Sequence, residues 1–162
     1  FLAGGGMTFN GDTAAANALD DYEEGTFTPS YQSSNNDASS LSYGASTLGS
    51  YIKIGRFIHF QLTVHLTSAS AGSGNPQIRG LPYTSSGSTP TNESTRFTVS
   101  TYNVNYQGGA GQSNHAYFPT INVAYLQFLT TNDNGVWAVN STSDFVVAGN
   151  SFVTISGMYI TN

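Results

Sequence analysis

The chain has 162 residues, of which 13% are aromatic and 8% are charged, with a formal net charge of −5 and no cysteine. A typical soluble domain is about one quarter charged, and four lysine and arginine residues are too few for a basic patch, which argues against nucleic-acid binding. The absence of cysteine excludes disulfides and thiolate chemistry, and no apolar run reaches the roughly 20 residues of a membrane helix. The length fits one domain. Because no apolar run is long enough, we expect a domain that is not embedded in a membrane.

Residues 1–25 differ from the rest of the chain, because they contain five of its nine acidic residues. Asp12 is placed to cap a short helix over residues 13–19, although a helix of this length needs packing partners. We expect residues 1–25 to form a neck segment and residues 26–162 to form one β domain. Because the chain begins with Phe1 rather than methionine, we expect a fragment of a longer protein.

The clearest strand pattern lies between Gly49 and Leu66. Apolar and polar residues alternate strictly from Ile58 onward, as is typical of a strand with one buried face. Gly55 separates this run from a second β-prone run at residues 50–54, which predicts a hairpin. We expect another β layer to cover the apolar side, whereas the other side is polar or faces a second subunit. The apolar side carries Ile58, Phe60, Leu62, Val64 and Leu66, and the polar side carries His59, Gln61, Thr63 and His65.

Further short strands and turn signals follow along the chain. Pro29 cannot donate to a β ladder, so residues 26–31 are expected to form an edge strand or the end of a strand. The apolar phase shifts near Ala124, which indicates a bulge or turn, and residues 132–135 (NDNG) predict a hairpin turn. Loops are expected at residues 33–47, 68–75, 84–94 and 105–114. Strands are expected at residues 77–83 (ending at Pro82), 96–104, 116–130, 136–139, 145–147 and 152–161, the last with a bulge at Gly157.

Many short strands with turns between them, and almost no helical periodicity, predict an all-β fold. We expect an antiparallel β-sandwich of jelly-roll-like kind.

Four stretches of the sequence resemble one protein family in their order and spacing. Together they are similar to the C-terminal region of bacteriophage tail-fibre and related virion adhesion proteins. The most specific piece is LDDYEEGTFTP (Leu19–Pro29), and the whole resemblance spans nearly the full chain. The stretches are residues 10–29 (NGDTAAANALDDYEEGTFTP), 49–60 (GSYIKIGRFIHF), 78–83 (IRGLPY) and 155–161 (ISGMYIT).

The resemblance implies a homotrimeric, mostly β tip on a fibre shaft, which belongs to the virion and binds a receptor outside the host cell. The chain has no collagen-like Gly-X-Y run and no self-cleaving chaperone domain, so the shaft is expected before Phe1. The family carries no transferable catalytic residues, and we expect neither an enzyme nor a cofactor.

Candidate ligand-binding residues are aromatic and amide side chains on expected loops, because aromatic faces stack on sugars and amides bond their hydroxyl groups. The first region contributes Tyr102, Asn103, Tyr106, His115 and Tyr117, and the second contributes Asp133 and Trp137. Trp137 has an alternative interpretation as a core residue of the sandwich.

Two further kinds of site were weighed against simpler interpretations. The acidic residues at positions 20, 21, 23 and 24 offer oxygen ligands for Ca²⁺ but lack the D-x-[DN]-x-[DN]-G spacing. We therefore expect solvated or neck-packing acids and no metal site. A glycan depolymerase needs two carboxylates about 5 to 10 Å apart. Outside the neck the sequence offers only Asp37, Glu93, Asp133 and Asp144.

The sequence therefore predicts the receptor-binding tip of a bacteriophage tail fibre, which attaches the virion to a host cell-surface glycan or outer-membrane component. The alternatives are a structural trimerisation cap of the fibre and, less favoured, a depolymerase.

Overall fold

The computed structural model describes residues 7, 21–87, 95–106, 114–131, 137–142 and 145–162. These residues form eleven strands and no helix, so nothing within them could cross a membrane as a helix. The predicted all-β class is confirmed. The strands are β1 (Tyr22–Phe27), β2 (Ser30–Ser33), β3 (Ser39–Tyr43), β4 (Leu48–Ile54), β5 (Phe57–Ser70), β6 (Pro76–Arg79), β7 (Arg96–Tyr106), β8 (Asn114–Tyr117), β9 (Tyr125–Thr131), β10 (Trp137–Val139) and β11 (Phe145–Ile160).

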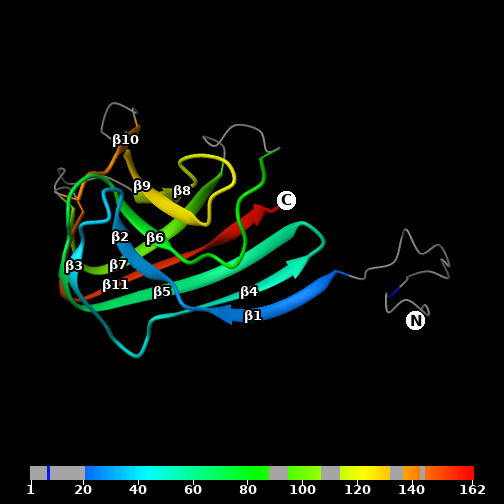
Figure 1. Cartoon of the computed structure of the whole chain (residues 1–162), viewed down its shortest axis with the longest axis horizontal. Helices are drawn as coiled ribbons and strands as arrows, with labels where there is room; N and C mark the ends of the chain where they lie inside the picture. Colours follow the sequence, from blue (N-terminus) through cyan, green and yellow to red (C-terminus); the bar gives the residue numbers. More distant parts are fainter. Residues whose placement is uncertain (1–6, 8–20, 88–94, 107–113, 132–136, 143–144) are drawn as a thin grey trace.

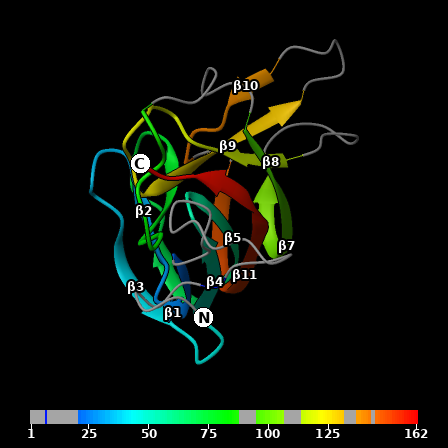
Figure 2. The same cartoon turned by 90° about the vertical axis from the view of Figure 1, so that its right-hand side faces the viewer.

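One antiparallel sheet, curled on itself, accounts for the architecture. Its strands follow the order β1-β4-β5-β11-β7-β8-β9-β6-β2, with β3 added to β5 and β10 added to β9. Thr28 and Pro29 are the only residues between β1 and β2, although these strands stand at opposite ends of the order. The sheet must therefore curl until its ends approach. Figures 1 and 2 show the result, with β1, β4, β5 and β11 in one layer and β6, β8 and β9 in the other.

The β4–β5 hairpin is the main wall of the core, as predicted. Gly55 has φ +56° at the first central position of the two-residue turn that joins Ile54 to Phe57. The predicted apolar stripe of β5 is at most 1% exposed at every position, and it packs with residues of the other layer such as Ile78, Leu126 and Phe128. Burying each of these side chains stabilises the fold by about 2 kcal/mol.

Four aromatic rings join the two layers in a closed set of edge-to-face contacts. Phe60 meets Phe97 at 5.2 Å and Tyr159 at 5.7 Å between ring centroids, and Phe118 meets the same two rings at 5.4 and 5.1 Å. Gly157 lies beside this cluster, in regular register with Phe60. The predicted bulge at Gly157 is therefore wrong. Glycine is needed there for space, because a Cβ atom would lie 2.3 Å from Cδ1 of Phe97.

Several predicted strand boundaries are wrong, most of them because the pairing of distant strands decides where a strand begins and ends. The expected strand at residues 26–31 is divided at Pro29 into β1 and β2, which lie on opposite edges. The expected loop at residues 33–47 contains β3, and β5 continues to Ser70. The expected strands at 145–147 and 152–161 form one strand, β11, whose pairing with β7 shifts register between Val147 and Phe152. Strand β6 ends at Arg79, where Gly80 has φ +88°, and not at Pro82.

Two predictions about the remaining segments have different outcomes. The phase change near Ala124 is confirmed, because a segment without strand structure separates β8 from β9. The helix expected over residues 13–19 and the turn at 132–135 lie outside the described residues. Strand β1 begins at Tyr22, within the expected neck, while the division into residues 1–25 and 26–162 stays a prediction.

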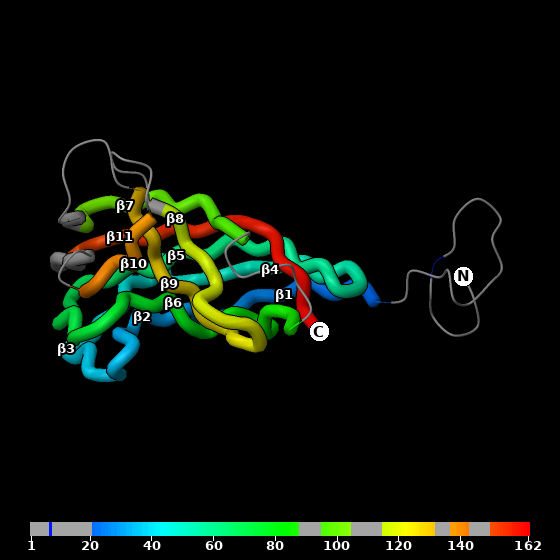
Figure 3. The backbone as a smooth tube through the Cα atoms, turned by 90° about the horizontal axis from the view of Figure 1, so that it is seen from above, coloured from blue at the N-terminus to red at the C-terminus, as the bar shows by residue number. Residues whose placement is uncertain are grey.

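The C-terminal end of the chain is fixed beside the β4–β5 turn. Arg56 donates from Nε to the carbonyl of Thr161 at 2.9 Å, and from Nη2 to Ser86 Oγ at 3.0 Å. The Thr161 amide in turn donates to the Arg56 carbonyl at 2.9 Å. Figure 3 shows β1, β4, β5, β11 and β7 running along the long axis of the domain, with the C-terminus at the end that carries this turn.

Candidate functional site

The candidate site lies on the outer side of the layer that contains β8, β9 and β10. Phe97, Ala116 and Phe128 pair in register across β7, β8 and β9, and all three are buried in the core. Their chain neighbours must therefore face outward, because successive side chains of a strand alternate. These neighbours are Arg96, Tyr117 and Gln127, and the same alternation along β9 places Trp137 of β10 on this outer side. We call these four residues the arginine–aromatic face.

The Arg96 guanidinium stacks between two aromatic rings. Its central carbon lies 4.1 Å from the centre of the Trp137 ring and 5.8 Å from that of Tyr117. Cation–π contacts of this kind restrict both partners to one arrangement. Tyr117 donates a hydrogen bond to Gln127 Oε1 at 3.3 Å, and burial raises the pKa of the Tyr117 hydroxyl. Trp137 nevertheless remains 51% exposed.

The sequence-predicted ligand residues fall into two groups. His115, Tyr117 and Trp137 lie on the outer side of β8 and β10, and the alternative interpretation of Trp137 as a core residue is wrong. Tyr102 and Asn103 lie on β7, six and seven residues beyond Arg96, which is roughly 20 Å at the rise of a strand. The side chain of Tyr106 and all of Asp133 lie outside the described parts of the chain.

The second group has its own contacts. Tyr102 is 65% exposed and meets the Phe152 ring edge to face at 6.1 Å. Asn103 has φ +54°, a conformation that asparagine tolerates, and its carbonyl accepts a hydrogen bond from Ser151 Oγ at 2.7 Å. The structure therefore divides the first predicted region, because His115 and Tyr117 lie on the same outer side as Trp137, whereas Tyr102 and Asn103 lie apart from them.

Sequence reasoning missed Arg96 and Gln127. The inward pattern of Phe97 and Val99 does place Arg96 on the outer side of its strand. Its stacking on Trp137, however, depends on three successive pairings, β7 with β8, β8 with β9 and β9 with β10, whose combined register the local pattern does not give.

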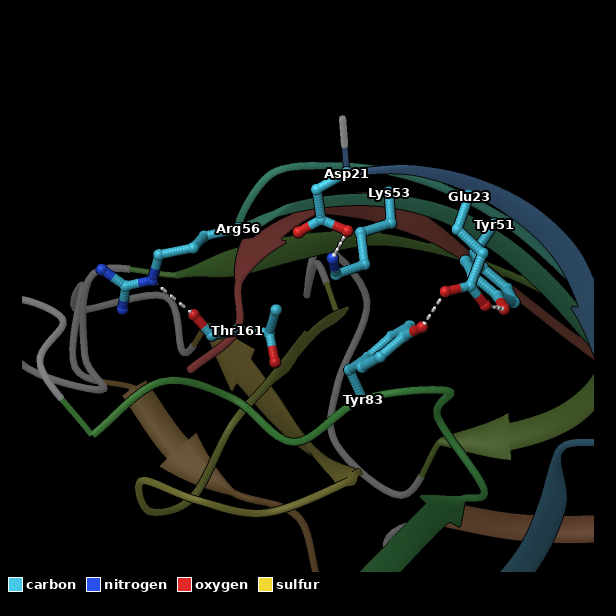
Figure 4. Close-up of polar contacts among 7 residues, drawn as sticks. All are labelled: Asp21, Glu23, Tyr51, Lys53, Arg56, Tyr83 and Thr161. Carbon is cyan, nitrogen blue, oxygen red and sulfur yellow. Dashed lines mark hydrogen bonds and ion pairs between the residues drawn. The ribbon is translucent and has the colours of Figure 1, made fainter. Parts of the chain in front are cut away.

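The acidic residues near the N-terminal end make contacts within the protein. Asp21 forms an ion pair with Lys53, and Glu23 accepts hydrogen bonds from the hydroxyl groups of Tyr51 and Tyr83 (Figure 4). Glu24 lies on the opposite side of β1 and accepts from Tyr22 Oη at 2.8 Å. Across the described residues, no three His, Asp or Glu side chains are grouped as metal ligands. The contacts of Asp21 and Glu23 instead join β1 and β4 to the segment after β6.

The Glu23 contacts lead to a pH-dependent prediction. Hydrogen bonds from Tyr51, which has the larger effect, and from Tyr83 hold the pKa of Glu23 below its ordinary value of 4.5. The carboxylate therefore stabilises the fold fully above pH 4.5 and loses this effect as the pH falls through the folded-state pKa. We expect Glu23→Gln to lower Tm by a few degrees at pH 7, and the difference from wild type to shrink progressively below pH 4.5 in thermal melts followed by circular dichroism.

Glu24→Gln is the matched control for this experiment, because Glu24 neighbours Glu23 but accepts a single exposed hydrogen bond. It should change Tm by much less, whereas Tyr83→Phe should reduce the effect of Glu23→Gln. A Tm difference for Glu23→Gln that stays constant from pH 7 to pH 3 would contradict the assignment.

Asp37 is held by hydrogen bonds that oppose a role in acid catalysis. Its carboxylate accepts from Ser33 Oγ, from the Ser73 amide at 2.7 Å and from Ser73 Oγ at 2.6 Å. These hydrogen bonds, of which the one from the Ser33 hydroxyl has the largest effect, lower the pKa of Asp37 to about 2. A general acid in glycoside hydrolysis requires a raised pKa. Asp37 therefore connects two loops, while Glu93, Asp133 and Asp144 lie outside the described residues.

The comparison with solved structures finds a similar protein from a bacteriophage tail. No protein-family model and no curated protein matches the chain. The crystal structure of Dettilon tailspike protein matches with a TM-score of 0.68 and 23% sequence identity, over 87% of this chain and 24% of that chain. The domain shares the fold of part of a tailspike protein. At this level of identity the match establishes the fold alone, and the chain spans about one quarter of the neighbour's length.

Proposed function

We propose that this domain is the receptor-binding tip of a bacteriophage tail fibre. It attaches the virion to a glycan or outer-membrane component on the surface of the host cell. It works outside the cell as a homotrimer at the end of a fibre shaft, and it binds its receptor without a cofactor and without catalysing a reaction.

The arginine–aromatic face is the observation that carries this proposal. The C–H faces of sugars pack on aromatic rings, and guanidinium and amide groups bond sugar hydroxyls. Trp137 offers an indole that is half exposed and held in place by Arg96, whereas Gln127 is buried and its Oε1 accepts a hydrogen bond from Tyr117. A platform that is already ordered loses little conformational entropy when a ligand binds.

Two other observations support the proposal. The fold shared with a tailspike protein favours a location in the virion tail. The arginine–aromatic face also lies in the layer opposite β1, where residues 1–20 join the domain (Figure 1). A shaft that precedes β1 would therefore leave this surface turned away from the virion.

Replacing Trp137 with alanine tests the proposed function. We expect the purified chain to bind members of an array of bacterial surface polysaccharides, and Trp137→Ala to weaken that binding at least tenfold, which corresponds to about 1.4 kcal/mol. The melting temperature should change little, because Trp137 is half exposed. Equilibrium binding measured on the best polysaccharide would give the affinity ratio.

Two control variants make the outcome specific. Ile121→Ala removes an exposed apolar side chain between β8 and β9 and should leave binding unchanged. Tyr102→Ala tests the second group that the structure separates, Tyr102 and Asn103, on the same polysaccharide. Equal binding by wild type and Trp137→Ala, with a loss only for Tyr102→Ala, would move the site to the second group. Binding by none of the polysaccharides or outer-membrane extracts would contradict receptor recognition and favour the structural cap.

A further inference from the structure

The outer face of β1, β4, β5 and β11 carries an apolar surface of unusual continuity. Tyr22, Ile54 and Phe57 are neighbours in register across β1, β4 and β5. The next row outward from the hairpin turn contains Ile52 and Met158, with His59 between them. All five apolar side chains are exposed, Phe57 by 61% and Met158 by 65%. We call these five residues the apolar sheet face.

This continuity indicates a contact surface. Single exposed apolar residues are normal on soluble proteins, but groups of large apolar side chains that touch one another mark protein–protein interfaces. A groove of about 540 Å³ adjoins the apolar sheet face and is lined by Glu24, Ser50, Ile52, His59 and Gln61 among others. The groove shares Ile52 with the apolar sheet face and is otherwise lined mainly by polar residues, so an apolar surface lies directly beside a hollow that a complementary protein surface can fill.

The distribution of charge on these strands fits a second copy of the same chain. Alternation turns Asp21, Glu23 and Lys53 to the opposite side of the sheet, where they bond to one another and to tyrosines. Among the described residues on this outer side, the titratable groups beside the apolar sheet face are the carboxylate of Glu24 and the imidazole of His59. Symmetric copies bring identical residues close together, so a surface with few charges avoids repulsion between like charges.

The entry point of the chain also favours a second copy. Residues 1–20 join the domain at Asp21, directly next to Tyr22 of the apolar sheet face. Copies whose N-terminal segments run together would therefore bring these faces toward one another. A glycan would require hydrogen-bonding side chains, whereas the five residues of this face are four hydrocarbon-rich side chains and one tyrosine.

We propose that copies of the chain associate through the apolar sheet face, with Phe57 and Met158 buried at the contact. The inference rests on the homotrimer of the proposed function and identifies the surface that forms it. The receptor-binding surface on β8 and β10 stays free, because it lies in the other layer of the domain (Figures 1 and 2).

The two methionines of the chain provide a direct test with the unaltered protein. Met158 belongs to the apolar sheet face and Met7 precedes the domain, and each is exposed in a single protomer, Met7 by 43%. Sedimentation velocity would give the size, and peroxide oxidation followed by peptide mass spectrometry would give both oxidation rates. We expect an oligomer in which Met158 oxidises at least fivefold more slowly than in the denaturant-unfolded chain, while Met7 slows by less.

Two variants complete the test. Phe57→Asp should yield a smaller species with fast oxidation of Met158, whereas Trp137→Ser, an equally large change on the other layer, should leave size and oxidation as in wild type. A monomeric wild type would overturn the proposal. If Met158 oxidises slowly in that monomer, residues 1–20 of the same chain must cover it. An oligomer with fast Met158 oxidation would also overturn it. Since polysaccharide binding is measured separately, loss of association and loss of receptor binding remain distinguishable.

Discussion

Replacing Gly157 with valine is expected to destabilise the domain by roughly 3 kcal/mol. A Cβ atom at this position would lie 2.3 Å from Cδ1 and 3.1 Å from Cε1 of Phe97, whose ring is 1% exposed. Phe97 cannot move aside, because Phe60 and Phe118 contact its ring within the aromatic cluster. Urea unfolding followed by tryptophan fluorescence and circular dichroism would measure the change in the free energy of unfolding.

Ser156→Val is the control for this substitution. It places the same side chain one position earlier in β11, where alternation turns it to the outer side and valine suits a strand. We expect its free energy of unfolding to lie within about 0.5 kcal/mol of wild type. Equal stabilities for Gly157→Val and wild type would show that the ring of Phe97 does not occupy this space.

Truncation of Phe60 to alanine should destabilise the domain by about 4 kcal/mol. Phe60 is fully buried in the β5 stripe and contacts Phe97 from β7 and Tyr159 from β11. Its removal leaves a cavity beside rings that belong to β7, to β11 and to the segment after β8. The loss should appear as a lower urea midpoint with an unchanged m-value.

An exposed aromatic residue provides the comparison for Phe60→Ala. Tyr102 lies on the outer side of β7 with 65% of its surface exposed, so Tyr102→Ala should cost less than about 1 kcal/mol. Similar losses for the two variants would mean that the stripe of β5 does not form the core.

The hairpin, the fold class and the core stripe could be predicted because their signals are local. Strict alternation over Ile58–Leu66 reflects burial of one side of a strand, and Gly55 reflects the positive φ of a tight turn. Pro29 was expected in an edge strand or at a strand's end, and it lies in the link directly before β2, where its missing N–H is harmless. Each of these inferences depends on a few neighbouring residues and on no knowledge of which strands pair.

Long-range pairing explains what the sequence did not predict. Strand β3 is rich in serine and has no apolar alternation, and it forms because β5 is long enough to offer a free edge there. The space-saving role of Gly157 depends on Phe97, which lies 60 residues earlier in the chain. The arginine–aromatic face likewise requires Arg96, Tyr117 and Trp137 from three strands, so their residue types could be proposed while their grouping could not.

The two-residue link at Thr28 and Pro29 determines how the domain would carry a mechanical load. Tension applied through Asp21 would act along the axis of β1, whose six residue pairs with β4 would share it in shear. Backbone hydrogen bonds lie perpendicular to the strands, so in this direction they must break together and not one after another. The far end of β1 passes through this link into β2, at the opposite end of the sheet order. In the proposed role, a pull on an attached virion would therefore strain both ends of the sheet together.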